Sequence, residues 1–217
     1  DDRLAVANMA VEAGAETGIF PADEVTARYL DRRADREWHP ERSDPDASYV
    51  RKVKIDLNSL EPLVALPHSP GNVVAVSEAR GTKIDQVYIG NCSNGTITDL
   101  RQTAEILRGN RVHPDVRAII VPASQKVYRQ AISEGLIDVF IEAGAVVSTP
   151  TCGACFGGHM GVLAEGERAI TTTNRNFKGR MGSPLAEVCL ANAYVAAAAA
   201  VAGEIVEPAS ICSEPVR

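Results

Sequence analysis

Short apolar runs alternate with helical segments over the last two thirds of the chain. The runs VYIG, AIIVP, AVVST and AITTT are interleaved with three segments that place apolar residues at helical spacing, namely 96–108, 125–134 and 184–202. Strands of a parallel sheet are buried on both faces and are joined by helices. The alternation therefore predicts an α/β fold with a parallel, helix-covered sheet in residues 71–217.

The first third of the chain gives a weaker pattern. Apolar residues recur at helical spacing in residues 3–15 and 22–32, which predicts two helices. The charged, proline-containing residues 31–48 are typical of an exposed connection. Residues 50–57 alternate between apolar and polar positions, which predicts a half-exposed strand, and residues 62–70 are expected to be irregular.

The composition is that of an ordinary soluble globular protein. The chain has 217 residues, and 45% of them are hydrophobic, so it can bury a substantial core. A net charge of −6 and an aromatic content of 5% argue against nucleic-acid binding, which favours a basic face and stacking side chains. No apolar run approaches the roughly 20 residues of a membrane span. The chain also opens without a leader pattern, and its five cysteines are an odd number, so we expect a cytoplasmic protein without disulfides.

Three cysteines supply the candidate chemistry. Cys92 in IGNCSNG follows one predicted strand, and Cys152 and Cys155 in PTCGACFGG follow another. Since the carboxyl ends of parallel strands meet at one edge of a sheet, we expect these turns to face the same ligand crevice. Three hypotheses fit the residues: a redox pair at Cys152 and Cys155, a zinc site completed by His159, or a [4Fe–4S] cluster with one open iron. The other two cysteines, Cys189 and Cys212, are interpreted as bystanders, Cys189 on the apolar side of the last helix.

A polar run follows the predicted threonine strand. In TTTNRNFKGRMG, Arg175 and Arg180 could bind carboxylates through paired hydrogen bonds, and Asn174 stands beside them. In the first helix, Asn8 and Glu12 lie four residues apart and therefore share one face. Taken alone, that spacing favours a solvated helix surface, and a loop rich in asparagine and arginine is usually a hydrogen-bonded surface turn.

The order and spacing of these motifs resemble a known family. IGNCSNGTITDLR, PTCGACFGG, TTTNRNFKGRMG and the early segment NMAVEAGAETGIF are similar to signatures of the aconitase superfamily, most of all to its 3-isopropylmalate dehydratase and homoaconitase large-subunit branch. The resemblance covers essentially the whole chain. It implies the α/β, parallel-sheet three-layer domain of aconitase type.

The resemblance also implies roles for single residues. Cys92, Cys152 and Cys155 would ligate a [4Fe–4S] cluster whose open iron binds substrate. Glu12 would assist departure of the iron-bound hydroxyl, with Asn8 beside it. The remaining matches are Asn174 on the cluster side and two arginines on the substrate side, Arg175 and Arg180. The implied enzyme is a hydro-lyase that reversibly dehydrates a hydroxy di- or tricarboxylate.

The resemblance further implies partners. The family's upstream domain has no counterpart in this sequence, and its swivelling domain is a separate small subunit in this branch. We therefore expect residues 1–46 to be a helical part of a preceding, incomplete domain with a charged linker, residues 47–217 to be the α/β cluster-binding domain, and the chain to be inactive alone. Substrates of the type of 3-isopropylmalate, homocitrate or homoaconitate, and 2,3-dimethylmalate or citramalate all stay open. The hypotheses from other classes are a cluster-dependent RNA-binding regulator and a zinc-stabilised module.

Overall fold

A single mixed sheet organises the protein. The computed structural model describes residues 1–31 and 33–212. Seven strands form the sheet in the order β2-β1-β7-β6-β3-β4-β5. Their bounds are β1 Leu63–Ala65, β2 Val73–Ala75, β3 Gln86–Gly90, β4 Arg117–Val121, β5 Val146–Val147, β6 Arg168–Thr171 and β7 Glu187–Leu190.

The five strands from β3 to β7 are parallel, and the two remaining strands are not. β3 pairs in parallel with β4 and β6, while β1 runs antiparallel to both β2 and β7. All five residues of β3 are buried, as the central position of this strand in the sheet requires. The predicted α/β fold with a parallel sheet is therefore confirmed, and β1 and β2 extend one edge of it.

Helices pack on one face of the sheet. The helices of the α/β part are α3 Val76–Ala79, α4 Ile97–Leu107, α5 Gln125–Ser133, α6 Leu136–Ala143 and α7 Ala193–Ala202. Alternate strand residues, such as Val87, Ile89 and Ile120, join α4, α6 and α7 in the larger hydrophobic core. The run of alanines in α7 is almost completely buried, because small side chains let this helix lie close to β3 and α4.

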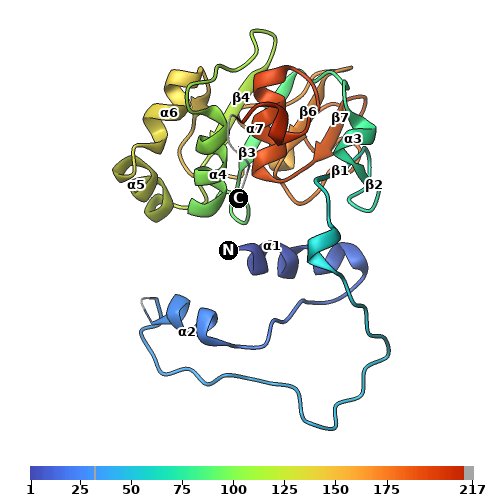
Figure 1. Ribbon diagram of the computed structural model, residues 1–217, viewed down its shortest axis with the longest axis vertical. Helices are drawn as coiled ribbons and strands as arrows, with labels where there is room; N and C mark the ends of the chain where they lie inside the picture. Colours follow the sequence, from blue (N-terminus) through green and yellow to red (C-terminus); the bar gives the residue numbers. More distant parts are fainter. Residues whose placement is uncertain (32, 213–217) are drawn as a thin grey trace.

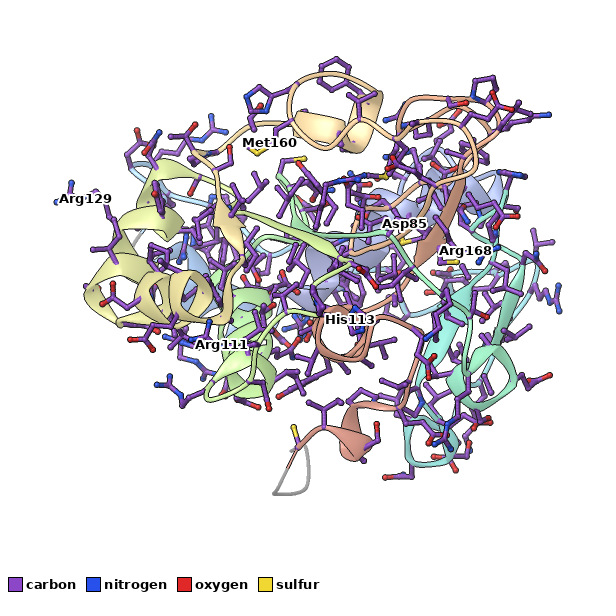
Figure 2. The ribbon with its side chains drawn as sticks, turned by 90° about the horizontal axis from the view of Figure 1, so that it is seen from above. Asp85, Arg111, His113, Arg129, Met160 and Arg168 are labelled. Atoms are coloured by element: carbon purple, nitrogen blue, oxygen red, sulfur yellow. The ribbon has the colours of Figure 1, made fainter. Side chains whose placement is uncertain are left out.

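Loops and a short 3-10 helix, η3 (Gly153–Phe156), cover the opposite face. The intervening strand residues, among them Tyr88 and Ile119, pack there in a second core with Ala154, and Met160 packs against this core. Figure 2 shows Met160 on the side of the sheet opposite to Arg111 and His113. The segment that carries Cys152 and Cys155 therefore runs across this face instead of ending at the sheet edge.

The first 62 residues, which we call the N-terminal segment, lie outside this core. The segment contains α1 Asp2–Met9, the 3-10 turn η1 Ala10–Ala13, α2 Glu24–Leu30 and the 3-10 turn η2 Leu57–Ser59. Figure 1 shows α1 against one end of the α/β part, with α2 further away and a long connection between α2 and η2. No residue of either α-helix is buried. Both predicted helices are thus present, although α2 ends before residue 32, which lies outside the described residues.

Three predicted elements are wrong. Residues 50–57 form no strand before η2, because an alternating segment needs a partner strand to satisfy its backbone and none lies beside it in residues 1–31 and 33–212. The segment 62–70, expected to be irregular, contains β1.

The segment 184–202, expected to be one helix, is divided into β7 and α7. Asn192 separates the two elements, because its side chain accepts a hydrogen bond from the amide of Val195 at 2.9 Å and caps α7. Cys189 accordingly lies on β7 rather than in the last helix, although it is buried as expected. Within the described residues, none of the helices has the length and apolar character needed to cross a bilayer.

Candidate metal and substrate site

The first cysteine turn, residues 90–96, joins β3 to α4. Two glycines fix it against the end of β4: a Cβ on Gly90 would stand 1.9 Å from the carbonyl oxygen of Val121, and a Cβ on Gly95 would stand 2.4 Å from the same oxygen. Gly90 also has a φ of +112°, in the region that favours glycine. Between them, the side-chain oxygen of Asn91 accepts hydrogen bonds from the amides of Ser93 and Asn94, both at 2.9 Å. The turn therefore has one well-determined backbone path.

Cys92 is exposed at the outer side of this turn. It lines a hollow of about 210 Å³ whose other walls include Leu4 of α1, Thr96 and Ser124. Thr96 caps α4, since its hydroxyl accepts from the amide of Asp99 and its own amide donates to the Asp99 carboxylate. Cys92 thus lies in the turn just before the capped amino terminus of α4.

The second cysteine turn, residues 150–160, leaves β5 and crosses the face of the sheet. The hydroxyl of Tyr88 donates to the carbonyl oxygen of Cys152 at 3.1 Å. Gly153 lies directly over the tyrosine, where a Cβ would come within 2.2 Å of the hydroxyl oxygen. Burial, and then the neighbouring Cys155 and Cys152, raise the pKa of the Tyr88 hydroxyl, so it stays protonated and donates.

The two cysteine turns approach each other through Asn91. Its side-chain amide nitrogen lies 4.0 Å from the Cys155 sulfur. The three cysteines of these two turns are exposed or half-buried. Over residues 1–31 and 33–212, no three histidine, cysteine, aspartate or glutamate side chains gather closely enough to hold a single metal ion. The zinc site with His159 as a fourth ligand, one of the three hypotheses from the sequence, would need four side chains to converge on one zinc.

An asparagine network joins α1 to the sheet. Asn174, in the loop after β6, donates to the side-chain oxygen of Asn8 at 2.5 Å and to the hydroxyl of Ser93 at 2.8 Å. Asn94 donates to the side-chain oxygen of Asn174 and to the carbonyl oxygen of Thr172. Three segments that are far apart in the sequence therefore meet beside the first cysteine turn, and the orientation of the Asn174 amide is set by its neighbours on both sides.

An ion pair lies next to this network. The guanidinium of Arg175 contacts the carboxylate of Glu12 at 2.5 Å, and the exposed fractions of the two side chains are only 27% and 15%. Arg175 also donates to Asn8 at 3.4 Å. The structure thus brings together four of the predicted site residues, Asn8, Glu12, Asn174 and Arg175. Glu12 is half-buried in this cluster, while Asn8 stays exposed.

Arg180 lies apart from that ion pair, against the second cysteine turn. A Cβ on Gly157 would come within 3.3 Å of the Arg180 carbonyl oxygen. The Nε atom of Arg180 is buried and makes no hydrogen bond to the described residues. Because a buried donor without a partner is costly, this guanidinium is suited to a carboxylate that is not part of the chain.

Sequence reasoning missed residues that hold the site together. Tyr88 was read only as part of an apolar strand, although a hydroxyl in a buried strand needs a partner. Ser93 and Asn94 stand directly after Cys92, and their polar side chains in a turn were the available signal. Neither residue type reveals its distant partner, because Asn174 is about 80 positions further along the chain.

Thiol labelling should separate the two kinds of cysteine. Burial raises the pKa of the Cys189 thiol to about 11, and burial followed by Glu105 raises the pKa of Cys212, so both stay protonated near neutral pH. At about pH 8, iodoacetamide is expected to modify the exposed Cys92 and Cys152 first and Cys189 only after unfolding, because the thiolate is the nucleophile. Peptide mass spectrometry over time measures the order. Early modification of Cys189 would contradict its placement in the core.

Comparisons with known proteins show the family of this chain. The sequence profile of the aconitase family (aconitate hydratase) matches residues 1–82 and 77–203. The 3-isopropylmalate dehydratase large subunit of Acetivibrio thermocellus is 56% identical over 208 residues, which cover 96% of this chain and 50% of that protein. The corresponding protein of Heliobacterium modesticaldum is 57% identical over 211 residues, covering 97% and 50%.

The chain spans about half the length of these curated relatives. The profile match nevertheless begins at residue 1 and runs through both cysteine turns and the asparagine loop to residue 203. The chain therefore belongs to the aconitase family.

Proposed function

We propose that this chain is the cluster-binding part of a hydro-lyase that reversibly dehydrates a hydroxy di- or tricarboxylate, with 3-isopropylmalate as the leading candidate. The observation that carries the proposal is the meeting of Asn8, Glu12, Asn174 and Arg175 beside the first cysteine turn. Such a set combines a carboxylate for proton transfer with a guanidinium for substrate carboxylates. The names of the relatives, 3-isopropylmalate dehydratase large subunits, favour the same reaction.

Cys92, Cys152 and Cys155 are the residues that would hold a [4Fe–4S] cluster. In such a cluster each thiolate binds a different iron, so the three sulfurs do not have to converge on one point. Accessible thiols on two neighbouring turns, with the Asn91 amide 4.0 Å from the Cys155 sulfur, are compatible with this donor set. A bound cluster with three protein ligands supplies an open iron, a Lewis acid for the substrate hydroxyl.

The protein side chains would bind and orient the substrate. Arg180, with its unpaired buried Nε, would bind one carboxylate, and Arg175 would bind another after exchanging its contact with Glu12. Glu12 would then be free to take up a proton from solvent and give it to the departing hydroxyl, which leaves as water. Asn8, held by Asn174, keeps α1 and therefore Glu12 at the first cysteine turn.

The chain would act with other polypeptide parts. The N-terminal segment exposes large apolar side chains, for example Ile19 at 81% and Val6 at 58%. Exposed apolar side chains gathered in one segment are compatible with an interface. We propose that residues 1–46 belong to a further domain of the large subunit, that residues 47–217 are the cluster-binding domain, and that a separate small subunit completes the enzyme.

The test is assembly of the complete enzyme. This chain, after anaerobic treatment with ferrous iron and sulfide, is mixed with the remaining half of the A. thermocellus large subunit and with that organism's small subunit. Formation of the unsaturated product from 3-isopropylmalate is followed by ultraviolet absorbance, with homocitrate, 2,3-dimethylmalate and citramalate as competitors. Turnover of 3-isopropylmalate that depends on this chain supports the proposal. An assembled complex that turns over none of these compounds contradicts it.

Glu12→Gln should abolish most of that turnover. The amide keeps the shape of the side chain but cannot transfer a proton, so a loss of about 100-fold or more in kcat is expected. Iron content should be unchanged, because Glu12 is not among the proposed ligands. Glu16→Gln on the same segment, where the side chain is exposed, is the matched control. Equal activity of the two variants would remove Glu12 from the reaction.

The remaining hypotheses give other outcomes in the same preparation. A zinc-stabilised module would retain zinc instead of iron and stay colourless. An RNA-binding regulator would shift RNA in a gel after iron removal, which the net charge of −6 disfavours.

A further inference from the structure

Tyr88 is a buried polar residue for which the proposed reaction has no use. It belongs to β3, the strand that leads into the first cysteine turn, and its exposed fraction is 0%. Its ring packs in the core of the loop-covered face with Ile119, Ala154 and Met181. Its hydroxyl, however, reaches out of this apolar core to the carbonyl oxygen of Cys152 at 3.1 Å.

Besides its packing through Ala154 and Met160, the second cysteine turn makes few hydrogen bonds to the rest of the protein. Among residues 150–160, the hydrogen bonds that leave the turn for other described parts of the chain involve Tyr88, through the Cys152 carbonyl, and Asn91, through the Cys155 sulfur. The remaining bonds are internal, such as the amide of Cys155 to the carbonyl of Cys152 at 3.0 Å. Both ties therefore start from β3 and the turn that follows it.

Gly153 shows that the fit between this turn and the tyrosine is close. Its φ is +52°, and an added Cβ would come within 2.2 Å of the Tyr88 hydroxyl oxygen and 3.1 Å of the ring carbon that bears it. The turn thus rests on the hydroxyl itself. A phenylalanine would fill the same core space but would leave the Cys152 carbonyl without this partner.

We propose that Tyr88 is a positioning residue that ties the second cysteine turn to the strand carrying Cys92, and so sets the separation of the cysteines. The expected effect of Tyr88 on iron retention rests on the proposed function. The hydrogen bond that holds the second cysteine turn to β3 does not depend on it. One hydroxyl on β3 thereby fixes the position of Cys152 relative to Cys92, although the two residues belong to loops 60 positions apart along the chain.

The test compares Tyr88→Phe with Tyr194→Phe. The control also removes one hydroxyl that makes one hydrogen bond, from Tyr194 to Glu105 at 2.6 Å, away from the cysteine turns. In the iron-free chain, amide hydrogen exchange in residues 150–160 should become about tenfold faster in Tyr88→Phe, the factor for a lost contact of about 1.4 kcal/mol. The melting temperature and the exchange in α6, which carries neither substitution, should match those of the control.

The second measurement is the rate at which the reconstituted chain loses iron. After reconstitution, iron loss to a chelator, followed by the decay of visible absorbance, should also be about tenfold faster in Tyr88→Phe than in Tyr194→Phe. Unchanged exchange in residues 150–160 overturns the inference. If the wild-type chain retains no iron, the proposed function fails, and the exchange experiment still decides the role of Tyr88.

Gly153→Ala probes the same contact from the other side. Its Cβ would push the turn away from the hydroxyl, so exchange in residues 150–160 should accelerate as in Tyr88→Phe. In the double variant, exchange should accelerate by less than the product of the two single-variant factors, because both substitutions act on one contact. Fully multiplicative effects would mean that the hydroxyl and the glycine act independently, which contradicts the proposal.

Discussion

Gly90→Ala is expected to lower the free energy of unfolding by about 4 kcal/mol, near the upper end of what single substitutions cause. The new Cβ would stand 1.9 Å from the Val121 carbonyl oxygen and 2.7 Å from its carbonyl carbon, and both are backbone atoms of the neighbouring strand. Neither can move without separating β3 from β4. The φ of +112° adds strain for any residue with a Cβ.

A matched glycine separates the clash from the backbone strain. Gly109 after α4 has a φ of +76°, and a Cβ there would meet nothing within 4 Å. Gly109→Ala should therefore cost only about 1 kcal/mol, the strain of the left-handed conformation. Urea denaturation followed by circular dichroism measures both variants. Similar midpoints for the two would contradict the close packing of the first cysteine turn against β4.

Cys152→Ser should abolish retention of iron while the chain stays folded. If the cluster is bound as proposed, the wild-type chain should hold about four irons after anaerobic reconstitution and desalting. Serine is a poor ligand for iron, so a variant with two thiolates should lose the brown colour. The fold should be unaffected, because Cys152 is exposed and its structural role is carried by the backbone carbonyl that Tyr88 binds.

Cys212→Ser provides the control. This cysteine is half-buried near Glu105 and lies outside both cysteine turns, so its loss should leave iron content and colour unchanged. Iron analysis and visible absorbance, with melting curves to verify folding, measure the difference. Equal iron in Cys152→Ser and the wild type would remove Cys152 from the ligand set. Loss of iron in Cys212→Ser would show that the bound iron is not held where we propose.

The strongest local patterns of the sequence were reliable guides to the fold. The runs around VYIG and AIIVP became β3 and β4, because short continuous apolar runs rich in β-branched residues fit the buried strands of a parallel sheet. The segment VRKVKIDL was misread as a strand because alternation alone does not provide a neighbouring strand. The strand EVCL was predicted as part of a helix, because a short apolar run beside an alanine-rich stretch fits helical spacing equally well.

In the candidate site, too, local sequence predicted some features and could not predict others. The cysteines and Arg175 could be named from motifs, since those residue types carry their chemistry with them. Their partners could not be named in this way. The contact of Glu12 with Arg175 joins residues more than 160 positions apart, and nothing in either local sequence specifies it. Tyr88 is an apolar strand residue by pattern, and only its burial under Gly153 reveals the hydroxyl as a support for the turn.

By itself, the sequence determined strands β3 to β6 of the sheet, the helices that follow them and the residue types of the loops. These features follow from periodicity, capping residues and side-chain chemistry, which act over a few neighbouring positions. The tertiary structure alone decided that α1 delivers Glu12 to the loop after β6, and that the second cysteine turn folds back over Tyr88. Such contacts depend on how strands are ordered and how loops cross the sheet, and that arrangement is a property of the packed chain as a whole.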